Sequence, residues 1–195
     1  MLHLTSQLLC TFGADDHWGN EYDMSMIIVL FFIAFSVRLL SLFKSISNEK
    51  TLRQQNAKEF GRINSVVLSL AHISYYFFCI LEAVLLRRHY NHFTSIGIGL
   101  FTFSMIMLWL VIRSLKDIWT VKLFISNKHC LNTNWLFRNI RHPNYFLNII
   151  PELFGIAFLC QAWHILAVGF PIYMIPLTIR IIQEHRVMKA TFPDY

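Results

Sequence analysis

Long apolar blocks alternate with shorter polar stretches along almost the whole chain. Each block is about 20 residues long, enough for a helix to cross the roughly 30 Å of hydrocarbon in a bilayer. Helices are the suitable element because the open edge of a sheet leaves backbone groups unsatisfied in lipid. The pattern predicts an all-α, polytopic membrane protein with five transmembrane helices, over residues 24–43, 63–86, 93–112, 145–160 and 164–182.

Only Gln161, Ala162 and Trp163 separate the last two blocks, so we expect these helices to form a tight antiparallel hairpin. One integral membrane domain is expected over residues 24–195. Residues 1–23 contain no Lys or Arg and lack the basic start and the cleavage site of a signal peptide. We expect this polar N-terminal tail to be dispensable, or to reflect an over-called start codon.

Composition supports lipid as the main solvent. Hydrophobic residues make up 55% of the chain and charged residues only 14%, whereas a water-soluble domain of this size needs more polar surface. The net charge of +6 might suggest nucleic acid, but the basic residues lie at the ends of apolar blocks and form no single stripe. We therefore expect membrane lipid as a partner and no nucleic acid.

The basic residues also predict an orientation. Fourteen of them fall in the polar stretches 44–62 and 113–144 and in the segment from Arg180 onward, whereas one other connection holds only Arg87 and Arg88. Basic loops are retained in the cytoplasm, so this bias predicts an N-out, C-in topology. A bacterial inner membrane is favoured over the endoplasmic reticulum.

The four cysteines predict no metal site. They occur singly, with no CxxC pair and no pattern of a disulfide framework. Cys130 directly follows His129, but adjacent residues lack the spacing of a zinc cluster.

A first polar cluster precedes the fourth apolar block. Arg141, His142 and Tyr145 place a guanidinium, an imidazole and a phenol within five residues of one another. Pro143 stiffens this backbone and suits the first turn of a helix, whose N-terminus favours anionic groups. From these residues alone, a basic-aromatic interface anchor explains the cluster as well as a binding site does.

A second polar cluster follows the fifth apolar block. Arg180 and Glu184 are spaced i, i+4, which in isolation predicts an ordinary helix salt bridge. The predicted hairpin, however, brings both clusters to the cytoplasmic side at similar depth. Two polar clusters that meet in this way indicate a small-molecule site.

Three ionisable residues fall inside apolar blocks, where such groups are costly and are candidates for function. Glu82 lies close to Arg87 by spacing, so we expect a structural pair there. Glu152 lies about two helical turns from Tyr145 and is placed to reach the site. His72 has no evident partner in the sequence, and we expect a hydrogen-bonded packing residue. The run from Gly97 to Gly99 is interpreted as close helix packing, because no strand precedes it.

Four motifs then show a family resemblance, over roughly residues 24–195 and best over 113–195. They are Leu115…Trp119-Thr120, His129-x-Leu131, Arg138-x-x-Arg141-His142-Pro143-x-Tyr145, and Arg180-x-x-x-Glu184…Met188…Phe192-x-x-Tyr195. In order and spacing the chain resembles the isoprenylcysteine carboxyl methyltransferase family of membrane enzymes. Phospholipid N-methyltransferases and membrane sterol reductases carry related versions of the third motif. Residues 47–61 look like a bacterial branch whose members O-methylate alkylpyrones or alkylresorcinols.

The resemblance implies S-adenosylmethionine as cofactor, enclosed on the cytoplasmic side by the 113–144 linker, the start of the fourth span and the C-terminal helix. By position, the implied cofactor-binding residues are His129, Leu131, Arg141, His142, Tyr145 and Glu184. The implied catalytic residues are Arg180, facing the acceptor, with Glu184 and His142. The chain departs from the family pattern at Trp135 and Pro193, which replace glycines, and at His185, which replaces a second glutamate.

The expected function is S-adenosylmethionine-dependent O-methylation of a lipophilic acceptor, either a prenylated carboxylate or a long-chain polyketide hydroxyl. A carboxylate needs only positioning, for which Arg180 is suited. A phenol or enol needs a base, for which His142 and Glu152 are the candidates. The alternatives are a phospholipid or amine N-methyltransferase, and a non-enzymatic membrane scaffold; a nicotinamide-dependent reductase is disfavoured by the short chain.

Overall fold

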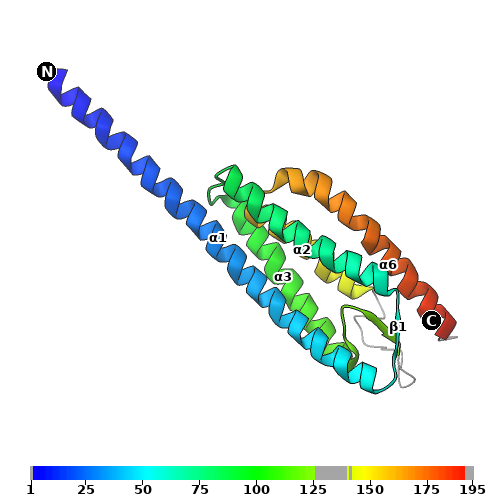
Figure 1. The fold of residues 1–195 in the computed structure, drawn as a ribbon. Coiled ribbons are helices and arrows are strands. Elements are labelled where there is room, and N and C mark those ends of the chain that lie inside the picture. Colours follow the sequence, from blue (N-terminus) through cyan, green and yellow to red (C-terminus); the bar gives the residue numbers. More distant parts are fainter. Residues whose placement is uncertain (1, 126–139, 141, 192–195) are drawn as a thin grey trace.

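The computed structural model describes residues 2–125, 140 and 142–191, with side chains described from residue 24 onward. Helices pack side by side in a bundle, and one long helix extends beyond it toward the N-terminus (Figure 1). The larger helices are α1 (Leu2–Gln54), α2 (Arg62–Leu85), α3 (His92–Leu115), α5 (Ile150–Cys160) and α6 (Phe170–Thr191). The shorter elements are β1 (Lys58–Phe60), the 3-10 turn η1 (Lys116–Ile118), β2 (Leu123–Ile125), and the π-helical segments η2 (Asn144–Ile149) and η3 (Ile165–Gly169).

Within the described part of the chain, four stretches of helix are long and apolar enough to cross a membrane, and they coincide with the first, second, third and fifth predicted spans. They cover residues 24–54, 62–85, 92–118 and 165–191. The remaining predicted span, now Asn144–Cys160, is shorter than these four. The count of five crossings therefore stays a prediction, while the integral membrane character is supported by the four long helices.

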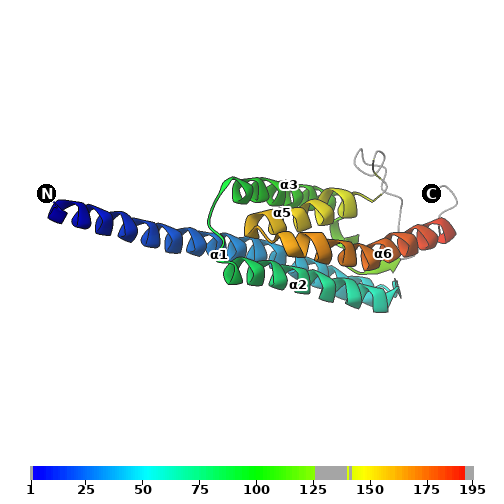
Figure 2. The same ribbon diagram turned by 90° about the horizontal axis from the view of Figure 1, so that it is seen from above.

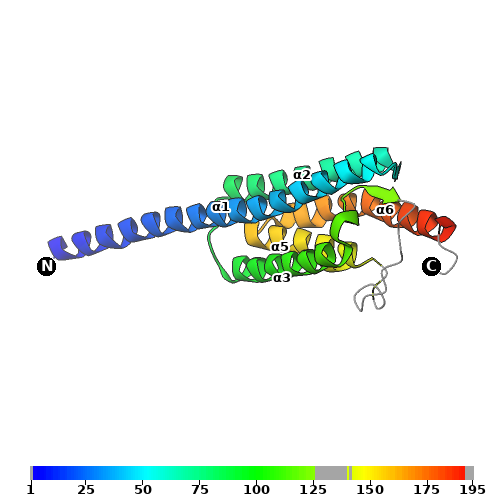
Figure 3. The same ribbon diagram turned by 90° about the horizontal axis from the view of Figure 1, so that it is seen from below.

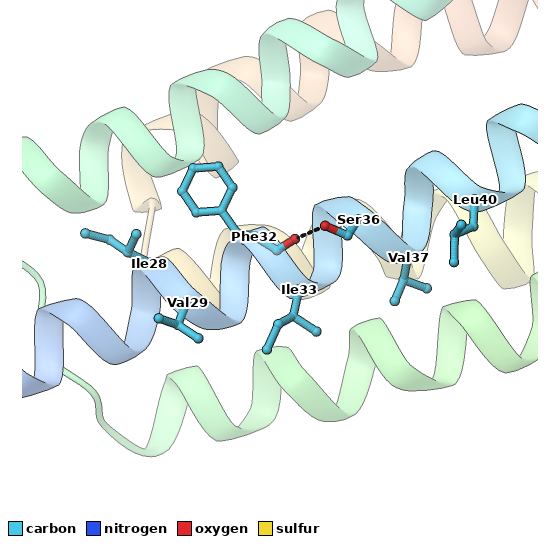
Figure 4. A pocket seen from close by; sticks show the side chains of 7 residues that line it. All are labelled: Ile28, Val29, Phe32, Ile33, Ser36, Val37 and Leu40. Carbon is cyan, nitrogen blue, oxygen red and sulfur yellow. Dashed lines mark hydrogen bonds between the residues drawn. The ribbon is translucent and has the colours of Figure 1, made fainter.

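Helix α1 is longer than expected: the apolar block was predicted to end at residue 43, but the helix continues to Gln54. One face packs against the bundle. Arg38 on this face is 16% exposed, and the residues buried on it are Ile27, Phe31, Ala34, Ser45, Asn48 and Leu52. The opposite face forms an open apolar groove, in which the Ser36 hydroxyl donates to the Phe32 carbonyl at 2.7 Å (Figure 4). That groove is lined by Ile28, Val29, Phe32, Ile33, Ser36, Val37 and Leu40.

The expectation of an all-α fold needs one correction, because β1 and β2 form a small antiparallel sheet. Lys58 pairs with Ile125 and Phe60 with Leu123, so the sheet joins the polar stretch after α1 to the one after α3. The sequence pattern concealed these strands because each is only three residues long. The sheet lies at the same end of the bundle as the C-terminal end of α6 (Figure 1).

Helix α5 is the centre of the bundle, with no exposed residue along its length. Helix α3 lies beside it, as Figures 2 and 3 show from opposite sides. Two glycines let these backbones approach: an added Cβ at Gly97 would lie 2.2 Å from the Leu159 nitrogen, and one at Gly155 would lie 2.7 Å from the Phe101 nitrogen. Close helix packing at Gly97 is thus confirmed, whereas Gly99 faces open space.

The predicted hairpin is confirmed, since α5 and α6 run in opposite directions on either side of Gln161 (Figures 2 and 3). Gln161 has a left-handed backbone with φ 51°, and its side chain donates to the Thr94 hydroxyl at 3.1 Å. Glu82 also stabilises the connection between α5 and η3, because it accepts from the backbone nitrogens of His164 and Ile165 at 3.2 and 3.0 Å. The expected pairing of Glu82 with Arg87 is wrong, because its basic neighbours are His164 at 2.9 Å and Arg88 at 3.8 Å.

Substitution of Gly97 by alanine is expected to lower the free energy of unfolding by about 1–3 kcal/mol, the usual cost of overpacking. The new methyl group meets the backbone of α5, which cannot move aside as a flexible side chain would. The matched control is Gly99→Ala, which meets nothing within 4 Å. Unfolding in lipid-detergent mixtures measures both, and equal stability of the two variants would contradict the packing argument.

Candidate functional site

The two prolines that begin the hairpin helices shape the local backbone. Pro151 and Pro171 each follow a π-helical segment, η2 and η3 respectively, by one or two residues. A proline lacks the N–H that an α-helix requires and its ring crowds the carbonyl four residues earlier. The wider π turn relieves this: the nitrogens of Ile150 and Phe170 bond to carbonyls five residues back, at Tyr145 and Ile165. The proline at 151 thus helps set the direction in which Tyr145 points.

The two predicted polar clusters meet at Glu184. The Nδ1 atom of His142 lies 3.1 Å from Glu184 Oε1, and the Tyr145 hydroxyl donates to Glu184 Oε2. Since an ionised carboxylate can only accept, His142 carries its proton on Nδ1 in this pair. Its Nε2 is then the nitrogen able to take up a proton. The predicted convergence of His142, Tyr145 and Glu184 is confirmed.

These three side chains differ in exposure. His142 and Tyr145 are buried, whereas the Glu184 side chain keeps 26% of its surface exposed. A carboxylate held by two buried donors, yet open on one side, can attract a cationic group of a ligand without moving.

Arg180 does not form the expected salt bridge within its helix. Across the described residues, Arg180 and Glu184 have no direct ion pair, although they are one turn apart. Arg180 is 2% exposed and instead donates to the Ser65 hydroxyl at 2.9 Å and to the Val121 carbonyl at 3.0 Å. Its Nε atom is buried and has no hydrogen-bond partner among the residues that the structure describes. Ser65 and Val121 were missed because nothing in the sequence relates α2 or residue 121 to α6.

Helix α1 holds the polypeptide that leads into the expected cofactor loop. The Asn48 side chain donates to the carbonyls of Lys116 and Trp119, at 2.9 and 2.8 Å. Ser45 accepts from the Val121 nitrogen at 2.9 Å. Lys116 has a positive φ of 51°, a strained conformation for a residue with a side chain, so Asn48 supports a backbone that would otherwise relax. The backbone of Val121 is therefore hydrogen-bonded to two helices: its nitrogen to Ser45 of α1 and its carbonyl to Arg180 of α6.

Several predicted site residues lie outside the part of the chain that the structure describes. They are His129, Leu131 and Arg141, together with the motif residues Trp135, Arg138, Phe192, Pro193 and Tyr195. Their implied roles in cofactor binding stay predictions. Within the described ranges, no group of three His, Cys, Asp or Glu side chains is arranged to hold a metal ion.

Glu152 belongs to a separate polar cluster, deeper in the bundle. Its Oε1 atom lies 2.9 Å from Arg38 Nε and 3.2 Å from His72 Nε2, and accepts from the Tyr76 hydroxyl at 2.6 Å. The expectation that His72 is hydrogen-bonded is confirmed, and its partners, which the sequence did not reveal, are Glu152 and the Tyr173 hydroxyl at 3.1 Å.

Replacing Ser45 by alanine is expected to speed hydrogen exchange of the Val121 amide about five- to tenfold, because that amide loses its acceptor. Mass spectrometry on peptides covering residues 116–122 measures the change. Ser47→Ala is the control, because Ser47 lies on the exposed face of the same helix. Unchanged exchange in Ser45→Ala would show that α1 does not hold this segment.

Comparison of the sequence with known proteins identifies the family to which the chain is related. The model of the isoprenylcysteine carboxyl methyltransferase (ICMT) family matches residues 97–190, the range that contains His142, Tyr145, Arg180 and Glu184. An uncharacterized protein of Haemophilus influenzae is 44% identical over 170 residues, which cover 87% of this chain and 99% of the relative. No solved structure matches the chain. The match over α3, α5 and α6, in a chain with four long apolar helices, shows that the protein belongs to the ICMT family of membrane methyltransferases.

Proposed function

We propose that the protein transfers a methyl group from S-adenosylmethionine to an oxygen atom of a lipophilic acceptor. One observation carries this proposal: Glu184 on α6 is joined to both His142 and Tyr145 at the start of η2. The sequence separates these residues by about forty positions. Family membership supplies the reaction type, and this junction supplies a place for a charged ligand at the end of an otherwise apolar bundle.

The residues present fit such a cofactor. S-adenosylmethionine would supply a methyl carbon made electrophilic by a positively charged sulfur. Glu184 is the partly exposed carboxylate suited to that positive charge, and Tyr145 and His142 fix both of its oxygens. By the family resemblance, His129, Leu131 and Arg141 would complete the pocket from the linker.

Arg180 is the residue proposed to hold the acceptor. Two of its nitrogens are committed to Ser65 and Val121, which fixes the plane of the guanidinium, while its buried Nε has no partner. A preorganised donor of this kind suits the oxygen of a carboxylate. Because displacement at a methyl carbon needs the two reacting atoms aligned at about 3–3.5 Å, orientation by Arg180 is its main contribution.

A hydroxyl acceptor would require one further step, removal of its proton. The tautomer that Glu184 imposes on His142 leaves Nε2 as the proton-accepting atom, so His142 is the proposed base. Glu152 is the less suitable candidate, because its Oε1 already accepts from Tyr76 and faces Arg38 in a different cluster. A carboxylate acceptor would need no base, and its methylation would tolerate loss of the imidazole better.

Substitution of Glu184 by glutamine is expected to weaken binding of S-adenosylhomocysteine and S-adenosylmethionine, with the stronger effect on the cationic cofactor. Arg180→Met is expected to keep cofactor binding within about twofold and to lower turnover at least about 100-fold, the cost of losing one preorganised donor. Calorimetry in lipid nanodiscs measures binding. Labelled methyl transfer to a host lipid extract measures turnover and identifies the product.

The matched control for Arg180→Met is Arg186→Met, on an exposed position of the same helix. Wild-type protein that gains no thermal stability from a saturating cofactor would favour a membrane scaffold instead. A ligand at about 100 times its dissociation constant adds about 2.7 kcal/mol. Label appearing on an amine headgroup would favour a phospholipid N-methyltransferase.

The active site is further proposed to face the cytoplasm. The end of the bundle that holds β1, β2 and the C-terminal part of α6 also carries most of the basic residues, whereas the α2–α3 connection holds Arg87 and Arg88 (Figure 1). Basic segments are retained on the cytoplasmic side, which supports the N-out, C-in orientation.

Single cysteines test this orientation in a background whose four native cysteines are replaced by alanine. A membrane-impermeant maleimide is expected to label Arg87→Cys in intact cells and to label Lys189→Cys only after the membrane is opened. Both positions are exposed in the structure, so access depends on the side of the membrane. Labelling of Lys189→Cys in intact cells would reverse the proposed topology.

A further inference from the structure

A cluster of five polar side chains lies in the interior of the bundle, away from His142 and Glu184. Its members come from four helices, and Glu152 on α5 is the shared centre. The Glu152 side chain is completely buried and Arg38 is 16% exposed. The cluster comprises Arg38 of α1, His72 and Tyr76 of α2, Glu152 of α5 and Tyr173 of α6.

The cluster lies deep in the apolar part of the protein. Glu152 is midway along the segment Asn144–Cys160, and His72 is close to the middle of α2. Charged groups at such a depth are costly and are kept where they bind or relay something. The negative charge of the Glu152 carboxylate is nevertheless balanced by the positive charge of the Arg38 guanidinium. His72 lies between two partners, with Nε2 at 3.2 Å from Glu152 Oε1 and Nδ1 at 3.1 Å from the Tyr173 hydroxyl.

The hydrogen bonding of Glu152 is one-sided. Oε1 faces all three neighbours, Arg38, His72 and Tyr76, while Oε2 is buried with no partner among the described residues. A buried carboxylate oxygen without a donor costs free energy, so an additional donor at this point would be bound favourably. The charge of Glu152 is already matched by Arg38. The complementary group is therefore a neutral donor such as a hydroxyl, and a second cation would leave excess charge.

Arg180 presents the opposite kind of unpartnered group. Its Nε–H is a buried donor, and Glu152 Oε2 is a buried acceptor. The Arg180 side chain lies beside the Tyr145 hydroxyl. Glu152 follows Tyr145 by seven residues along the same helical segment, so it lies deeper by at most about 10 Å at the α-helical rise. One elongated ligand with an anionic head at Arg180 and a hydroxyl about 10 Å further into the membrane would satisfy both.

We propose that the Glu152 cluster is a second, deeper subsite of the acceptor pocket, which binds a hydroxyl group on the apolar chain of the acceptor. This inference rests on the proposed function for the identity of the ligand as the methyl acceptor. Glu152 Oε2 accepts from the hydroxyl, and Arg38, His72 and Tyr76 hold the carboxylate in place. Glu152 lies within residues 97–190, whereas Arg38, His72 and Tyr76, which hold its carboxylate, lie outside the family match.

Fatty acids of one chain length that carry a hydroxyl group at different positions test where this subsite lies along the bound chain. Octadecanoic acid is compared with its 3-hydroxy, 10-hydroxy and 17-hydroxy derivatives, as ligands of the full chain in nanodiscs of phosphatidylethanolamine and phosphatidylglycerol. Displacement of radiolabelled octadecanoic acid gives each dissociation constant. The 10-hydroxy acid is expected to bind about tenfold more tightly than octadecanoic acid, as for one hydrogen bond to a charged group. The other two are expected to gain less than about twofold.

The double variant Arg38→Met/Glu152→Leu removes both charges together, because removing one would leave the other unpaired in the bundle. It is expected to bind all four acids within about twofold of one another and to keep its affinity for S-adenosylhomocysteine. Glu82→Gln is the control, since Glu82 is a buried glutamate in the last turn of α2, outside the Glu152 cluster. This control is expected to keep the tenfold preference.

Equal binding of the four acids by the wild-type protein would overturn the subsite, and this measurement depends on no variant. A preference that persists in the double variant would also overturn it, because the hydroxyl would then be bound elsewhere. Binding of S-adenosylhomocysteine is measured separately. Its absence, together with a preserved hydroxyl preference, would reject the proposed cofactor and leave the subsite standing.

Discussion

The arrangement of the site depends on the carboxylate of Glu184, which joins the last helix to the start of η2 through His142 and Tyr145. Apolar contacts between α6 and η2 bring the two elements together but do not by themselves fix an orientation, because they are not directional. Hydrogen bonds to a charged group fix both distance and orientation, and they strengthen where water is scarce. The Glu184 carboxylate is nevertheless partly exposed, and this exposed side is the feature that allows a ligand to approach.

Arg180 extends the same constraint to the N-terminal half of the chain. Through Ser65 it is tied to α2, and through the Val121 carbonyl to the segment that Ser45 of α1 also holds. The family-matched helices are thus oriented by parts of the chain that lie outside the match. This arrangement explains why α1 continues beyond its apolar block to Gln54: its last turns carry Ser45 and Asn48, whose side chains bind the backbone after α3.

The sequence predicted the long helices and the hairpin, because both follow from the lengths of apolar and polar stretches along the chain. Apolar blocks of membrane-spanning length located α2 and α3 within a few residues, whereas α1 and α6 continue past their predicted ends to Gln54 and Thr191. The three-residue connection at Gln161 predicted the hairpin that brings His142 and Glu184 together. Features built from a few residues were missed. The strands β1 and β2 are too short to show alternation, and each depends on a partner more than sixty positions away.

Long-range polar contacts were equally hidden. His72 and Glu152 are eighty positions apart and Arg38 is further still, so no spacing rule could join them. Arg180 and Glu184 were linked by spacing to each other, but packing gave each a partner on another element. A spacing of four residues makes a contact within one helix available, whereas a buried group takes the partners that satisfy it most completely.

The two polar clusters also differ in a way that bears on function. Replacing a buried ion pair by apolar residues is often neutral or stabilising, whereas breaking one costs about 3–5 kcal/mol, so stability alone is a weak reason for Arg38 and Glu152 to persist. Packing of α1 against α5 could be achieved by side chains such as Ile27 and Phe31, which already lie on the same face. In addition, Glu152 Oε2 has no hydrogen-bond partner among the described residues, and an unsatisfied buried oxygen is unfavourable in an ion pair that serves stability alone. A binding role accounts for both the charge and the unpaired oxygen. In that role Glu152, within the family match, would depend on Arg38, His72 and Tyr76 from the part of the chain that the family model does not cover.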